Sequence, residues 1–78
     1  MSNNQYSDKI ITDSIDILTM LMNKTQYISL SDTEKNIFNL NIDHLVYSLN
    51  NTTREHLSSK QMIEIESIIQ KARAYAKQ

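Results

Sequence analysis

The sequence contains no cysteine, glycine or proline, and these absences exclude several classes of site and fold. Without cysteine, the chain cannot form disulfides or thiolate metal centres. Without glycine, it lacks the residue that phosphate-binding loops and dinucleotide-binding fingerprints require. Glycine also supplies the positive φ angles of tight hairpin turns, so its absence argues against a β-rich fold. An all-α fold, with helices joined by connections rich in Asn and Ser, is the natural alternative.

An excess of charge of one sign and long apolar runs are also absent. The formal net charge is −1, so electrostatics give the chain no general attraction to nucleic acid or to an anionic membrane. No apolar run approaches the roughly 20 residues that a membrane-spanning helix requires. The N-terminal segment MSNNQYSDK lacks the apolar core of a signal peptide. These features predict a soluble, cytoplasmic protein that binds no membrane.

The chain is short, with 78 residues, and is predicted to form one domain over residues 1–78. A chain of this size buries only about 60% of the surface that its unfolded form exposes, so its stability margin is small. Because disulfides are excluded, self-association or partner binding is the expected reinforcement. The abundance of Ile, Asn and Lys is typical of an AT-rich genome and would fit a bacterium, phage or plasmid.

Apolar periodicity predicts three helices, over about residues 8–24, 31–50 and 58–76, packed as a small bundle. The first is expected to begin after an N-cap at Ser7, with Asp8 in its first turn. Its apolar arc is wide enough for two neighbours and comprises Ile10, Ile11, Ile15, Ile17, Leu18, Leu21 and Met22. Residues 25–30 are predicted to be an apolar-anchored connection, because no second strand could pair with them.

Capping boxes mark the starts of the second and third helices, at Ser31–Glu34 and at Ser58–Gln61. The second helix has a core stripe of Phe38, Ile42, Leu45 and Leu49, with Val46 at its edge. The third helix has an apolar face of Met62, Ile65, Ile68, Ile69, Ala72, Tyr75 and Ala76. A coiled-coil dimer built on the third helix is the alternative architecture.

No arrangement of reactive side chains indicates an enzyme. His44 and His56 lie on different elements, and neither has the i, i+4 partner of a zinc-binding helix. Asp43 and His44 are adjacent, so on a helix they point about 100° apart and do not share a site. A serine nucleophile would need an oxyanion hole, which usually relies on a tight turn that favours glycine. We therefore predict a non-enzymatic protein without catalytic, metal-binding or cofactor-binding residues.

The C-terminal third is the most basic part of the chain, and Lys71, Arg73 and Lys77 form its candidate basic patch. Bases in the final turns of a helix are explained by their favourable interaction with the helix dipole. A surface that tracks phosphates normally gathers more positive charge than this. The sequence therefore favours a protein partner over direct contact with nucleic acid.

Opposite its core stripe, the second helix carries a second apolar seam. Leu40 and Tyr47 lie seven residues apart on one face, with Ile37 beside them and with Asp43 and His44 as flanks. Such a seam would meet another helix of the chain, a second copy or a partner protein. Asp43 could then hold a partner's Arg or Lys by a charge-assisted hydrogen bond. Leu40, Asp43, His44 and Tyr47 are therefore the candidate partner-binding residues.

Residues 24–49 also carry a recognisable pattern. It comprises Lys24-x-x-Tyr27, Leu30-Ser31-Asp32-x-Glu34, Phe38, Asp43-His44 and Leu49. This pattern resembles the middle of the haemolysin-expression-modulating (Hha/YmoA) family of small, helical, non-enzymatic bacterial proteins. Members of that family bind the dimerisation region of the nucleoid protein H-NS and modulate gene silencing. The resemblance implies that Asp43 matches the family's partner-binding acid.

The sequence thus predicts a small protein-interaction module, acting as a homodimer or as a regulatory or inhibitory subunit. The first alternative is a modulator of gene expression that acts through a nucleoid-associated protein or through weak DNA contact. The second is an inhibitor, antitoxin or immunity-type protein encoded by a mobile element.

Overall fold

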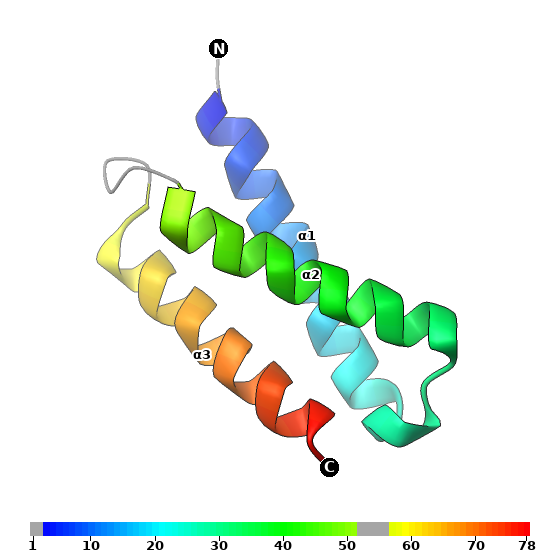
Figure 1. The fold of residues 1–78 in the computed structure, drawn as a ribbon. Coiled ribbons are helices and arrows are strands. Elements are labelled where there is room, and N and C mark those ends of the chain that lie inside the picture. Colours follow the sequence, from blue (N-terminus) through cyan, green and yellow to red (C-terminus); the bar gives the residue numbers. More distant parts are fainter. Residues whose placement is uncertain (1–2, 52–56) are drawn as a thin grey trace.

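Three helices make up most of the structure, which is a computed structural model. It describes the backbone of residues 3–51 and 57–78 and the side chains of residues 9–50 and 57–78. The elements are α1 (Asn3–Lys24), the 3₁₀ turn η1 (Tyr27–Ser29), α2 (Asp32–Asn51) and α3 (Ser59–Ala76), and these residues include no strand. Successive helices run in opposite directions, and the start of α1 lies at the opposite end of the bundle from the last turn of α3 (Figure 1). The predicted all-α bundle of three helices is confirmed.

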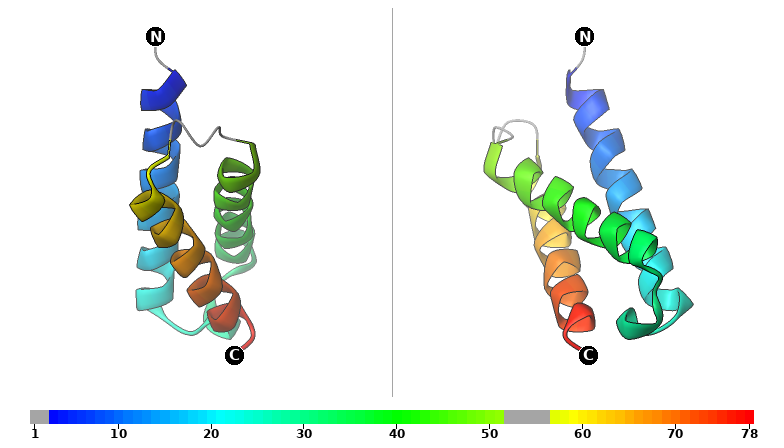
Figure 2. Two further views of the ribbon diagram at one scale, coloured as in Figure 1. Left: turned by 90° about the vertical axis from the view of Figure 1, so that its left-hand side faces the viewer. Right: turned by 45° about the vertical axis from the view of Figure 1, so that its right-hand side comes forward.

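The three helices pack around one another, so α3 is part of a bundle and not an isolated coiled-coil strand. In Figure 1, α2 crosses in front of α1, and α3 lies beside them. The most extensive contact joins α1 to α2, and α3 packs against both. The two further views confirm that no helix stands apart from the other two (Figure 2).

The core lies where the predicted apolar faces meet. The most deeply buried apolar side chains are Leu18 of α1, Phe38 and Leu45 of α2, and Ile65 and Ala72 of α3, each fully shielded from solvent. The remaining members of the predicted faces, including Leu49 and Val46, belong to this cluster or pack partly buried against it, apart from Ile10, which is partly buried. The core stripes of all three helices are therefore confirmed.

The connection after α1 is anchored, as predicted, by two of its apolar residues, Tyr27 and Leu30, whereas Ile28 is exposed. Leu30 is buried, and the Tyr27 ring stands edge-on to the rings of Phe38 and Tyr75, with centroids 5.6 and 5.9 Å away. The ring centroids of Phe38 and Tyr75 are 5.3 Å apart. These three rings join η1, α2 and α3 at one end of the bundle.

The predicted start of the first helix is wrong. α1 begins at Asn3 and not after Ser7, so Asp8 does not lie in its first turn. No glycine or proline interrupts residues 3–7, and a serine inside a helix costs less than about 0.7 kcal/mol relative to alanine. The helix can therefore extend past Ser7 at little cost. The connection between the predicted second and third helices falls largely on residues 52–56, outside the described residues.

Both predicted capping boxes are present. At α2, the backbone N–H of Glu34 donates to Ser31 Oγ over 3.1 Å, and the N–H of Ser31 donates to Glu34 Oε1 over 2.9 Å. At α3, Ser58 and Gln61 make the same reciprocal pair. Glu34 also accepts a hydrogen bond from Lys24 at the end of α1, so this carboxylate links the two helix ends.

The Glu34 carboxylate is expected to make the protein less stable in acid. The Lys24 ammonium, and then the Ser31 backbone N–H, hold the pKa of Glu34 below its ordinary value. A carboxyl whose pKa is lowered by folding contributes its full stabilisation of the folded state above the unfolded-state pKa of about 4.3. This contribution is lost as the pH falls through the folded-state pKa. The free energy of unfolding of wild type and of Glu34→Gln, measured in urea from pH 3 to 7, should converge toward low pH. Asp16→Asn is the control, because Asp16 is exposed and forms no ion pair among the described residues. A difference in free energy between wild type and Glu34→Gln that stays constant from pH 3 to 7 would contradict the prediction.

Candidate protein-interaction surface

The outward face of α2 carries three large apolar side chains that the bundle does not cover. Ile37, Leu40 and Tyr47 are 40%, 53% and 68% exposed, respectively. They follow the helical spacing of three and seven residues, so they project from one face, opposite the buried Phe38 and Leu45. We call these three residues the α2 ridge.

Among the described side chains, three other large apolar residues are exposed, but each lies on a different element. Met20 is on α1, Ile28 is in η1 and Ile63 is on α3. Apolar residues scattered singly on a surface are ordinary, whereas a contiguous apolar patch indicates a contact surface. The α2 ridge is the place in the described side chains where several large apolar residues share one helix face.

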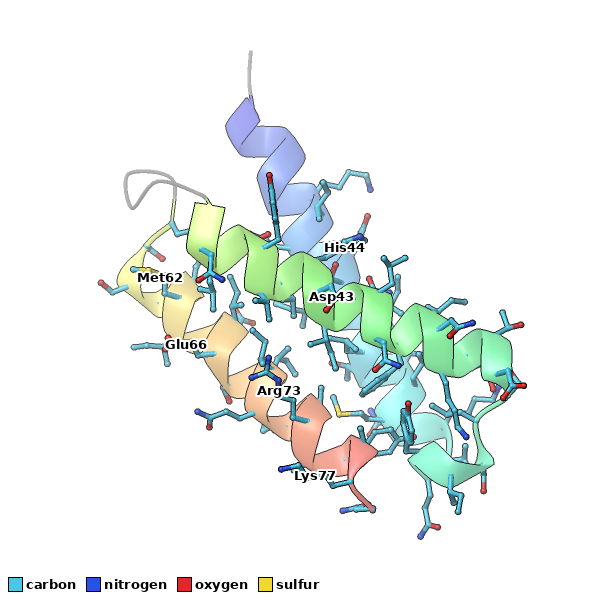
Figure 3. All side chains as sticks on the ribbon, viewed as in Figure 1. Asp43, His44, Met62, Glu66, Arg73 and Lys77 are labelled. Carbon is cyan, nitrogen blue, oxygen red and sulfur yellow. The ribbon has the colours of Figure 1, made fainter. Side chains whose placement is uncertain are left out.

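Asp43 and His44 point to different sides of α2, as Figure 3 shows. Asp43 is exposed and faces the side of α2 that borders α3, where it lines a hollow with Arg73 and Lys77. His44 is partly buried on the side that borders α1, and its Nδ1 lies 3.5 Å from Ser14 Oγ. The two residues therefore do not share a site, and Asp43 is the more accessible to a partner.

The contact between α1 and α2 contains three buried polar residues that the periodicity did not predict. Ser14, Asn41 and Ser48 are 1%, 5% and 7% exposed. Asn41 Nδ2 donates to the Ile37 carbonyl over 2.8 Å, and Ser48 Oγ donates to the His44 carbonyl over 2.9 Å. Both bonds stay within one turn of α2, so these groups can be buried without a partner on α1. Such side chains lack the apolar signal that identifies a core position in a sequence.

A groove runs between α2 and α3 on the side where Asp43 lies. Its lining includes Ile42, Val46 and Leu49 of α2 and Ile69, Arg73 and Ala76 of α3. Arg73 borders both hollows that make up this groove, and its side chain extends from α3 toward α2 in Figure 3. We call this feature the α2/α3 groove. It could not be read from the sequence, because it depends on how two helices pack.

The candidate basic patch is divided between two sides of α3. Arg73 and Lys77 are one turn apart and border the α2/α3 groove. Lys71 is two residues before Arg73, which places it about 200° around the helix. It lies on the face of Glu64, seven residues earlier, which lines a hollow against α1. The structure therefore brings together Arg73 and Lys77 but not Lys71.

The described side chains contain no group of three or more His, Asp or Glu residues placed to hold a metal ion. His56 lies outside them. No helix within the described part of the chain is long and apolar enough to cross a membrane.

No protein-family model, curated protein or solved structure matches the chain. The resemblance to the Hha/YmoA family stays a prediction.

Proposed function

We propose that this protein is a non-enzymatic binding module that acts by holding a partner protein, or a second copy of itself, against the α2 ridge. The observation that carries this proposal is the exposure of Ile37, Leu40 and Tyr47 on one face of a helix whose opposite face forms the core. Burying a side chain of this kind contributes roughly 1.5–3 kcal/mol. A chain with a small core gains stability from covering such a face.

The spacing of the ridge favours a helix as the partner element. Ile37, Leu40, His44 and Tyr47 recur at intervals of three, four and three residues, which is the spacing of a helix–helix seam. A helix laid along this row would bury the ridge and bring Asp43 within reach of a basic residue of the partner. Such a contact suits a regulatory or inhibitory subunit, because it can be made and released without chemistry.

Replacing Leu40 and Tyr47 together with serine is expected to weaken partner binding or self-association by about 100-fold, because two apolar anchors on one helix face are lost. The monomer should keep its fold, because Leu40 and Tyr47 lie outside the buried core. Sedimentation velocity measures self-association. Affinity purification of tagged wild-type and variant proteins from the source cell, compared by mass spectrometry, measures partner binding.

Ile63→Ser is the matched control, because Ile63 is an isoleucine of similar exposure on α3. Partners retained by Ile63→Ser and lost by the double variant would identify the ridge as the contact. If the folded double variant self-associates and retains partners as the wild type does, the ridge is not the interface.

A modulator of gene expression is a second candidate, and the exposed position of Asp43 supports it. The resemblance to the Hha/YmoA family implies a nucleoid protein as partner and Asp43 as a contact residue. Asp43 is exposed and forms no ion pair with another described residue. In the same affinity purification, a nucleoid protein that is held by the wild type and lost by Asp43→Asn would favour this candidate.

A further inference from the structure

The α2/α3 groove has an apolar floor. Val46 and Leu49 of α2 and Ala76 of α3 are partly buried, and Ile42 and Ile69 lie beneath them with 8% and 6% exposure. Ile42 to Leu49 and Ile69 to Ala76 each span seven residues, or about 10 Å of helix axis. The floor is therefore two helical turns long.

The two rims of the groove carry opposite charge at the same end. Asp43 stands on the α2 rim, and Arg73 and Lys77 stand on the α3 rim of the same hollow. No ion pair joins them, and within the described part of the chain neither base pairs with any other acid. Glu66 lies seven residues before Arg73, toward the other end of the α3 rim. Positive charge on that rim is thus concentrated at one end.

We infer that the α2/α3 groove binds an amphipathic helix of another protein, whose flank facing α3 carries two carboxylates one turn apart. This inference rests on the proposed function as a binding module, but it concerns a surface separate from the α2 ridge. The partner helix would lie in the groove as a fourth helix of the bundle, with its apolar face over Val46, Leu49 and Ala76. Its carboxylates would pair with Arg73 and Lys77, and its opposite flank, facing Asp43, would be neutral or basic.

A second copy of this chain does not offer such a helix among its described residues. The exposed acids of α1, Asp13 and Asp16, lie on a helix with one large exposed apolar residue, Met20. The ridge of α2 has Asp43 on its flank, and the next exposed acid toward the helix start, Asp32, is eleven residues away. On α3 the exposed acids Glu64 and Glu66 are two residues apart, and Ile63 is its one large exposed apolar residue. No described helix therefore combines an exposed apolar row with two acids one turn apart. The charge of the rims therefore indicates a different protein.

The opposite charges of the rims also fix the direction of the bound helix. Reversing a helix in the groove, with its apolar face kept downward, exchanges its two flanks. An acidic flank would then meet Asp43 and lose its contacts with Arg73 and Lys77. A partner with one acidic flank therefore binds in a single direction, which is the form of specificity that charged rims supply.

Two synthetic helical peptides test this inference. Both peptides carry leucines along one face and lysines on one of the two flanks beside it. On the remaining flank, the first peptide carries glutamates and the second carries lysines. The glutamate peptide is expected to bind about tenfold more tightly, because two exposed ion pairs replace two repulsions. Fluorescence anisotropy measures the affinities. Chemical-shift changes at the amides of Val46, Leu49, Ile69 and Ala76 locate the peptide.

Arg73→Glu/Lys77→Glu is expected to reverse the preference, so that the lysine peptide binds more tightly. Lys60→Glu/Lys71→Glu changes the net charge by the same amount at exposed lysines that do not line the groove, and it should leave the preference unchanged. Equal affinities, no reversal, or shifts confined to the α2 ridge would overturn the inference. Equal reversal by both double variants would also overturn it. If the Leu40/Tyr47 variant loses a cellular partner but neither peptide binds the groove, the proposed function is supported and this inference is overturned.

Discussion

Replacing Phe38 with alanine is expected to lower the free energy of unfolding by about 3–5 kcal/mol. The ring is fully buried, and it contacts Tyr27 and Tyr75, so its loss leaves a cavity where η1, α2 and α3 meet. Small domains have a total stability of about 5–15 kcal/mol, and a chain this short lies near the low end. Much of the variant should therefore be unfolded at 37 °C. Urea titrations followed by circular dichroism measure the difference.

Ile28→Ala is the control for this prediction, because Ile28 is 72% exposed in the neighbouring turn. Its free energy of unfolding should lie within about 0.5 kcal/mol of the wild-type value. If Phe38→Ala is destabilised by no more than Ile28→Ala, the three rings do not form the core of that end of the bundle.

The apolar core could be predicted because each helix has one dominant apolar face. The stripe from Phe38 through Ile42 and Leu45 to Leu49 carries the helical period, and both capping boxes are local patterns. The polar contact between α1 and α2 could not be predicted in this way. Ser48 and Asn41 satisfy their own polar groups within one turn, and periodicity does not distinguish this from exposure to water.

The contact surfaces depend more strongly on tertiary structure. The spacing of Leu40 and Tyr47 predicted a shared face, and the structure shows that this face is exposed. Lys71 and Arg73 are close in sequence but lie on different sides of α3, which the two-residue spacing already implies. Asp43 and Arg73 come from different helices and border one hollow. Only the packing of α2 against α3 places them there.

Replacing Tyr75 is expected to destabilise the protein about as much as replacing Phe38. Tyr75→Ala should lower the free energy of unfolding by about 3–5 kcal/mol, since it removes a buried aromatic ring. Tyr75→Phe keeps the ring and isolates the hydroxyl, which donates to the Thr25 carbonyl and lies 3.3 Å from that of Leu21. Loss of this bond is expected to cost about 1 kcal/mol. Urea titrations of both variants at pH 7 measure the two contributions. If Tyr75→Phe matches Tyr75→Ala, the ring contributes little.

The same hydroxyl predicts a loss of stability in alkali. Burial, followed by the nearby charges of Glu34 and Tyr27, raises the pKa of Tyr75 above its ordinary value. The unfolded chain releases this proton near pH 10, whereas the folded chain retains it to a higher pH. The contribution of the hydroxyl is therefore complete below pH 10 and declines as the pH rises beyond it. Tyr75→Phe has no hydroxyl to ionise and lacks this pH dependence. Between pH 10 and 11 the free energy of unfolding of the wild type should therefore fall toward that of Tyr75→Phe. A gap between wild type and Tyr75→Phe that stays constant from pH 7 to pH 11 would contradict this prediction.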